Sequence, residues 1–200
     1  MGHHHAHHVP GSSGGRRALT IVLVLVSLYM VAELIGGWLS NSLALLADAG
    51  HMFSDAAALG LALFAIWMAQ KPATAERTFG YYRAEILAAL VNGAALIVIA
   101  VFILVEAWGR FRQPPEVDAP LMMAIAAGGL LVNLVGLWVL AGRRSDSLNL
   151  RGAWLHVLSD ALGSLQAVAA GALILWLGWN WVDPLASVLI ALLVTYSAWS

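Results

Sequence analysis

The sequence "LALLADAGHMFSDAAALGLALFAIWMA" at residues 43–69 is apolar for long enough to cross a bilayer, yet it contains His51 and Asp55. A membrane-spanning helix needs about 20 predominantly apolar residues. Ionisable side chains within such a helix are costly to bury and usually have a function. The sequence around this pair is nearly repeated: "HMFSDA" at residues 51–56 is similar to "HVLSDA" at residues 156–161. The stretch indicates a membrane protein with a repeated functional pair.

The composition of the whole chain agrees with a membrane location. Of its 200 residues, 61% are hydrophobic and 10% are charged, whereas soluble domains carry about 25% charged residues. The formal net charge of -1 argues against nucleic acid as a partner, because phosphate binding needs a basic surface. The chain has no cysteine, so any metal must be bound by nitrogen and oxygen. We expect an integral membrane protein.

Six apolar runs of spanning length divide the chain, separated by stretches rich in Gly, Pro and polar residues. The first run continues for about 20 residues without a small-residue cleavage site, which favours a membrane helix over a signal peptide. The pattern therefore predicts an all-α bundle of six transmembrane helices. The expected spans are 18–38, 43–69, 81–108, 119–141, 150–177 and 183–199.

The distribution of basic residues predicts the orientation, because Lys and Arg are retained on the cytoplasmic side. With the amino terminus inside, only Arg110 and Arg112 lie outside. Both termini are then cytoplasmic. The inside residues are Arg16, Arg17, Lys71, Arg77, Arg83, Arg143, Arg144 and Arg151.

The repeated motif lies in the second helix of each three-helix half. Because three is an odd number of spans, the halves have opposite topology. A weak inverted 3+3 repeat with polar groups at matching depths is typical of secondary transporters.

The two HxxxD pairs can form one metal site. Residues four apart lie on nearly the same face of a helix, so His51 and Asp55 point one way, as do His156 and Asp160. The second and fifth helices run antiparallel, which brings two nitrogens and two oxygens to one point. Zn²⁺ takes such a tetrahedral ligand set.

The charges of the ligands and the ion suggest how such a site would release its metal. Two carboxylates neutralise a divalent ion, but an emptied site leaves two negative charges in a medium where ionised groups are expensive. Protons should therefore enter as the metal leaves. The site predicts a proton-for-metal exchanger.

Other interpretations are weaker. A single buried His is most often a packing residue, but the only histidines outside the amino-terminal tail both belong to HxxxD pairs. Haem ligation needs no Asp one turn after each His. A metallohydrolase needs an open metal position and a general base, and a passive channel needs weak binding. We therefore expect a transporter and not an enzyme.

Four longer stretches are similar to the cation diffusion facilitator family, and most of all to its zinc-exporting bacterial members. They are "SNSLALLADAGHMFSDAAALG", "RTFGYYRAEILAALVNG", "EAWGRFRQP" and "LNLRGAWLHVLSDALGS". The resemblance covers about residues 16–199. It implies a homodimer of six-helix chains in the cytoplasmic (inner) membrane. The resemblance also implies export of zinc in exchange for protons by alternating access. The central metal site would consist of His51, Asp55, His156 and Asp160.

The resemblance also sets expectations about specificity and domains. His at the first ligand position resembles members that prefer zinc over cadmium or manganese, while iron, cobalt and nickel stay open because nitrogen and oxygen ligands do not enforce one metal. Members usually continue into a cytoplasmic metallochaperone-like domain. The sequence to Ser200 does not contain it, so we expect either a truncated sequence or a short member of the family. We expect residues 16–200 to be the transmembrane domain and 1–15 a His-rich cytoplasmic tail, native or derived from a purification tag.

The remaining polar residues and several glycines are expected to have supporting or structural roles. Asp48 shares the face of His51, so it either relays protons or orients the imidazole, or it caps polar groups near the outer entrance. Glu33, Glu85 and Glu106 lie within or near the ends of the first and third helices, and an interfacial ion pair is expected for Glu85 beside Arg83. Interhelical hydrogen bonds are expected for Asn92 and Asn133, and close helix contacts at Gly128, Gly129, Gly163 and Gly171.

Overall fold

The computed structural model describes residues 13–54, 56, 82–142 and 148–199, and these form an all-α bundle. Its labelled helices are α1 (Ser13–Ser40), α3 (Tyr82–Arg112), α4 (Ala119–Ala141), α5 (Leu148–Leu177) and α6 (Val182–Trp199). Residues 43–54 are also helical and are called the 43–54 helix below. The predicted all-α helical bundle is confirmed, while the inverted 3+3 repeat and the cytoplasmic termini stay predictions. Asp55 and the His-rich tail (residues 3–8) lie outside the described residues.

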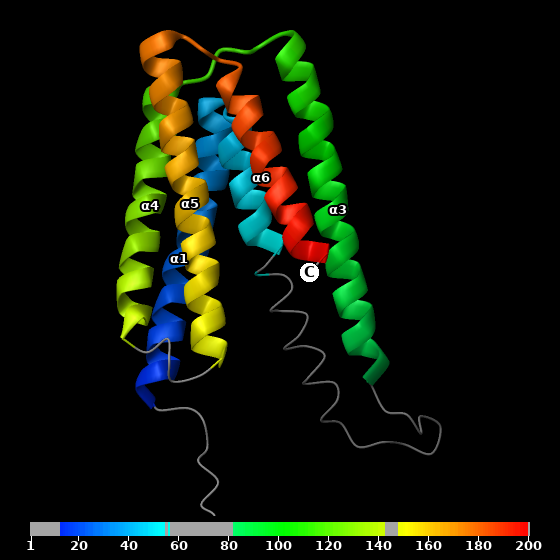
Figure 1. Cartoon of the computed structure of the whole chain (residues 1–200), viewed down its shortest axis with the longest axis vertical. Coiled ribbons are helices and arrows are strands. Elements are labelled where there is room, and N and C mark those ends of the chain that lie inside the picture. The colour runs from blue at the N-terminus through cyan, green and yellow to red at the C-terminus, as the bar shows by residue number, and fades with distance from the viewer. Residues whose placement is uncertain (1–12, 55, 57–81, 143–147, 200) are drawn as a thin grey trace, which may run out of the picture.

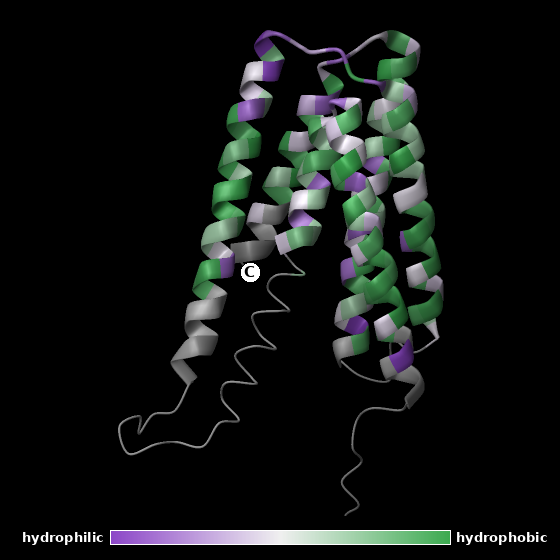
Figure 2. Ribbon diagram, turned by 180° about the vertical axis from the view of Figure 1, so that it is seen from behind, coloured by the Kyte–Doolittle hydropathy of each residue, from purple (hydrophilic) through white to green (hydrophobic). Residues whose placement is uncertain are grey.

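The helices have the length and apolarity that a bilayer requires. Within the described residues, four segments qualify as spans by themselves: Leu19–Ser40, Leu90–Arg112, Ala119–Ala141 and Leu150–Leu177. α6 has a shorter apolar part, Val182–Leu193. Large apolar side chains point outward, as on α3, where Val98, Phe102 and Val105 are each about two-thirds exposed. Hydrophobic residues run along the helices and the most hydrophilic stretch lies at the connections of one end (Figure 2), so the surface is suited to lipid.

The helices are tied together at one end of the bundle and diverge toward the other (Figure 1). α1, α4 and α5 run side by side, and α3 packs along α6. Connections 41–42, 113–118 and 178–181 all lie at the end that we call the loop end. α1 and α5 begin, and α4 ends, at the opposite end, called the far end. α1 begins and α6 ends toward the far end, while the side of the membrane that each end faces remains a prediction.

Local sequence explains where helices begin and end near the loop end. The Asp118 carboxylate accepts a hydrogen bond from the Leu121 amide at 3.1 Å, and a proline occupies the first turn of α4, as is typical of a capped helix start. Asn41 has a positive φ of 56°, which lets the chain turn sharply between α1 and the 43–54 helix. The Ser42 hydroxyl then accepts a hydrogen bond from the Leu45 amide at 3.2 Å and caps that helix.

The apolar core is unevenly distributed between the two ends. The larger cluster lies at the loop end and is built mainly from small residues of the 43–54 helix, α3, α4, α5 and α6, such as Ala44, Ala107 and Ala126. A smaller cluster at the far end consists of Val22, Leu140, Leu150 and Val157, with partly buried neighbours. Small side chains let helices approach closely where there is no water to drive them together.

The predicted interhelical contacts are confirmed. The Asn133 amide donates to the Ser164 hydroxyl at 3.4 Å, and the Ser54 hydroxyl donates to the Asn92 side-chain oxygen at 3.3 Å. At Gly171 a Cβ would lie only 2.5 Å from Met123 Cγ. These groups therefore hold α4 against α5 and the 43–54 helix against α3.

Candidate metal centre

The two predicted histidines approach each other from different helices. The His51 and His156 ring centroids are 6.2 Å apart, with the ring planes inclined at 65°. With metal–nitrogen bonds of about 2 Å, two imidazoles that share one ion bring their centres to roughly 5–6 Å. The 43–54 helix and α5 thus place both rings near the separation that a shared ion needs.

The predicted carboxylate of α5 lies on the same face as its histidine. His156 Nε2 is 3.6 Å from Asp160 Oδ2, one helical turn away. The His156 side chain is 41% exposed while that of Asp160 is 1% exposed. The imidazole therefore reaches toward solvent-accessible space and the carboxylate lies behind it in the interior.

The ligand set is incomplete within the described residues. Asp55, the fourth predicted ligand, lies outside them, and in the described part of the chain no group of three or more His, Asp or Glu side chains is placed so that it could hold a metal ion. The full set of four ligands therefore remains a prediction.

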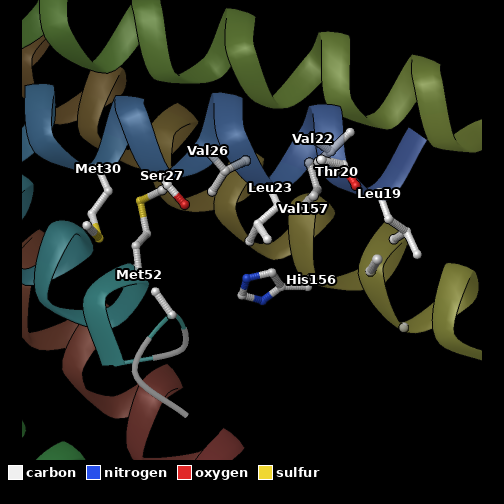
Figure 3. A pocket seen from close by; sticks show the side chains of 13 residues that line it. Leu19, Thr20, Val22, Leu23, Val26, Ser27, Met30, Met52, His156 and Val157 are labelled. Atoms are coloured by element: carbon white, nitrogen blue, oxygen red, sulfur yellow. The ribbon is translucent and has the colours of Figure 1, made fainter. Parts of the chain in front are cut away.

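A cavity of about 650 Å³ reaches His156 from the far end. Its walls come from the first half of α1, the start of α5 and the 43–54 helix, and the imidazole stands in the space between them (Figure 3). Most of the lining is aliphatic, with a few hydroxyls and thioethers. The labelled lining residues are Leu19, Thr20, Val22, Leu23, Val26, Ser27, Met30, Met52, His156 and Val157.

Two further carboxyl groups lie buried on the inner side of the histidines. Asp48 is 3% exposed and packs against α5, where a Cβ on Gly163 would be 3.2 Å from Asp48 Oδ1. Glu33 of α1 is 1% exposed, and a Cβ on Gly129 would be 2.8 Å from its Oε1. Both carboxyl groups lie near enough to Asp160 for their negative charges to repel that of Asp160 when all are ionised. The glycines on α4 and α5 leave the room that these side chains occupy.

Glu33 is the functional candidate to which the sequence alone assigned no role. Among the described residues, no donor reaches its Oε2. A buried polar atom without a partner is unusual in proteins and calls for an explanation. The sequence signal was present, since Glu33 lies inside an apolar span, but nothing in the sequence showed that it faces Asp48 and Asp160 instead of the membrane surface.

The arrangement suits the binding of a small cation. Two imidazole rings converge beside a buried carboxylate, and an accessible cavity leads to one ring. Two more carboxyl groups lie nearby, so the region carries an excess of negative charge when all its acids are ionised. A divalent cation or protons would relieve that charge.

Comparison with known proteins agrees with this geometry. Residues 19–200 match the family described as "Cation efflux transmembrane domain". The chain is 48% identical over 202 residues to a "Cadmium, cobalt and zinc/H(+)-K(+) antiporter" of Bacillus subtilis. It is 48% identical over 203 residues to the "Zinc transporter ZitB" of Escherichia coli, and 45% identical over 199 residues to the "Metal cation efflux system protein CzcD" of Cupriavidus metallidurans.

Each alignment includes 100% of this chain but only 63%, 64% and 62% of the three relatives, in that order. The chain spans somewhat less than two-thirds of the length of these proteins. The matched region nevertheless includes all the described helices except the first residues of α1. The chain therefore belongs to the cation efflux family, the cation diffusion facilitators, as a multi-pass membrane protein.

Proposed function

We propose that this chain carries Zn²⁺ out of the cytoplasm in exchange for protons. His51, Asp55, His156 and Asp160 would bind the ion as a tetrahedral site in the middle of the membrane. Zinc and protons are substrates, and the protein acts as a transporter of the cytoplasmic membrane. The homodimer and the cytoplasmic orientation of both termini, with residues 16–200 as the transport domain, belong to the same proposal.

The observation that carries the proposal is the approach of His51 to His156 at 6.2 Å, beside an Asp160 side chain that is 1% exposed. An unpaired charge in this position would be expensive. Two carboxylates and two neutral imidazoles offset the charge of one divalent ion. The names of the relatives, which mention zinc, cadmium and cobalt, support a divalent metal as the substrate.

Proton coupling follows from the same charges. When the metal leaves, the carboxylates of the site lose their counter-ion in a low-dielectric region, and protons replace it. Asp48 and Glu33 interact with Asp160, and we propose that they share the protons taken up. This assigns Asp48 to the proton relay and not to a cap at the entrance.

Alternating access would connect the site first with one side of the membrane and then with the other. The cavity that reaches His156 from the far end supports an ion path on that side, which the proposal assigns to the cytoplasm. Release at the loop end would require the helices to separate there.

The test is zinc flux in proteoliposomes with an imposed pH gradient. In the native chain, reversing the gradient should reverse the direction of net Zn²⁺ movement. Asp160→Ala should reduce flux to the level of empty vesicles, whereas Asp118→Asn, which changes an exposed cap far from the histidines, should transport normally. Zinc flux that ignores the gradient, or undiminished flux by Asp160→Ala, contradicts the proposal.

A further inference from the structure

Asp183, in the first turn of α6, is a buried carboxylate that binds the start of another helix. It accepts hydrogen bonds from the Ser42 hydroxyl at 2.7 Å and from the amides of Leu43 and Ala44 at 2.8 and 3.2 Å. Asp183 is 0% exposed. Free amides at a helix start attract a negative charge. A residue about 140 positions away in sequence thus caps the 43–54 helix.

Arg110 at the end of α3 completes this cluster. Its Nη1 lies 3.8 Å from Asp183 Oδ2, and its side chain is 13% exposed. The same guanidinium donates to the backbone oxygen of Asn41 at 2.7 Å and to the Asn41 side-chain oxygen at 3.2 Å. Arg110 therefore joins α3 to α6 and to the turn that precedes the 43–54 helix.

The 113–118 connection is bonded to the same turn. The Asn41 side-chain amide donates to the Glu116 backbone oxygen at 3.1 Å, and the Asp118 amide donates to the Ser40 backbone oxygen at 2.9 Å. The turn at residues 40–44 is thus held by α3, by the 113–118 connection and by α6. We call Asp183, Arg110 and the groups that they bind at residues 41–44 the loop-end latch.

The latch has a direct mechanical link to the metal centre. His51 follows Leu43 by eight residues on one continuous helix, which corresponds to about 12 Å along the axis. A helix transmits a displacement of its first turn as a rigid element. Movement of residues 42–44 away from α6 would therefore move His51 relative to His156.

We propose that Asp183 is a positioning residue, and that the loop-end latch keeps the loop end closed and sets the place of His51. This inference rests on the proposed function, in which the loop end must open to release the ion. Asp183 need not touch the ion. When Asp183 separates from residues 42–44, the loop end becomes open to water and the two imidazoles move apart.

The test uses single cysteines, because the chain has none of its own. Ala47→Cys places a thiol on the 43–54 helix at a position that is 1% exposed, within the loop-end core. The rate at which a polar maleimide labels this thiol is measured in detergent without zinc. Adding Asp183→Asn should raise the rate at least about fivefold, because labelling follows the population of the open form. Arg110→Gln, which leaves the three hydrogen bonds to Asp183 in place, should raise it less.

Two controls separate local opening from general loosening. Asp118→Asn changes a carboxylate of the same end that caps α4, and it should leave the rate at Ala47→Cys unchanged. A thiol at Leu140→Cys, buried at the far end, should be labelled at the same rate with and without Asp183→Asn. If Asp183→Asn does not yield a monodisperse protein, Arg110→Gln carries the test alone and must still accelerate labelling at Ala47→Cys.

The outcome is independent of whether zinc is transported. Unchanged labelling at Ala47→Cys in both latch variants overturns the latch and leaves the proposed function intact. Equal acceleration at Leu140→Cys also overturns it, because Asp183 would then only stabilise the fold. A second measurement is a zinc titration of the purified protein. Asp183→Asn should lower the affinity for zinc, because His51 is no longer held in place. Asp183→Glu, which keeps the negative charge of the acceptor, should restore most of that affinity.

Discussion

The loop end and the far end of this bundle share α4 and α5, but the two ends are held together differently. At the loop end, small apolar side chains form the larger core, and the latch groups join three chain segments by hydrogen bonds. At the far end, a small apolar cluster borders a cavity of about 650 Å³ that reaches His156. The two histidines of the candidate site therefore lie between a more closely packed region and a region that a cavity makes accessible.

This asymmetry has a physical origin in the sequence. Alanines and the capped turn at residues 40–44 let the loop-end helices approach closely, whereas, among the described residues, the buried far-end cluster is made of Val and Leu side chains from α1, α4 and α5 alone. Closely packed helices resist separation because many contacts would have to be lost at the same time. Motion should therefore be easier at the far end than at the loop end.

The strongest test of the contrast is to remove the acceptor at the loop end. Asp183→Ala leaves three donors of the 43–54 helix start without their partner, and each buried unsatisfied group costs about 1–3 kcal/mol. We expect the free energy of unfolding in detergent to fall by about 3 kcal/mol or more. Tryptophan fluorescence during denaturant unfolding measures it.

Asp118→Ala is the matched control, because it removes a single exposed cap, for which about 1 kcal/mol is expected. Equal losses in the two variants would mean that the loop end owes little to Asp183.

A change at the boundary between the two regions should alter selectivity more than stability. His51→Asp replaces the proposed nitrogen ligand by a carboxylate, which can bind through one or both oxygens and so accommodates a larger ion. We expect the ratio of Cd²⁺ to Zn²⁺ transport to rise by about tenfold, equivalent to about 1.4 kcal/mol. Competitive flux measurements with both ions would check this, and an unchanged ratio would show that the first ligand position does not discriminate between them.

The far end can be probed by filling its cavity. Leu23 lines the cavity and is 46% exposed, so Leu23→Trp should slow zinc entry by about threefold while the unfolding free energy changes by less than about 0.5 kcal/mol. Leu28 of the same helix is 67% exposed and is not one of the described residues that line the cavity. Leu28→Trp should transport at the native rate. Equal slowing in both variants would place the ion path elsewhere.

The smallest effect is expected for Arg110→Lys. The positive charge beside Asp183 is kept, but the planar fork that bonds Asn41 is lost. We expect a loss of about 0.5 kcal/mol in unfolding free energy. A loss as large as that of Asp183→Ala would show that the guanidinium, and not the helix cap, dominates the loop end.

The helices could be predicted from the sequence because the bilayer fixes their length and apolarity. The span expected at 119–141 coincides with α4 (Ala119–Ala141), where Asp118 and the following proline mark the start and Gly142 the end. α1 and α3 extend beyond their expected spans by several residues. Hydropathy detects the part of a helix inside the membrane, but hydrogen bonding continues into the interface.

The candidate site could be predicted only in part. The HxxxD spacing predicted that His156 and Asp160 share a face, because helical periodicity is a local property. The burial of Glu33 and the contact of Asp183 with residues 42–44 depend on the packing of helices that are distant in sequence. A single sequence carries no local signal for such contacts, so nothing in the residues around Asp183 indicates that it binds residues 42–44.

The aliphatic wall of the cavity has a consequence for which ions can travel along it. On the proposed ion path between the far end and His156, a hydrated cation would meet methyl and methylene groups, two thioethers and few hydroxyls. Such a passage offers little replacement for lost water. Mg²⁺, which gives up its hydration shell reluctantly, would be held back by slow dehydration before any ligand could discriminate against it.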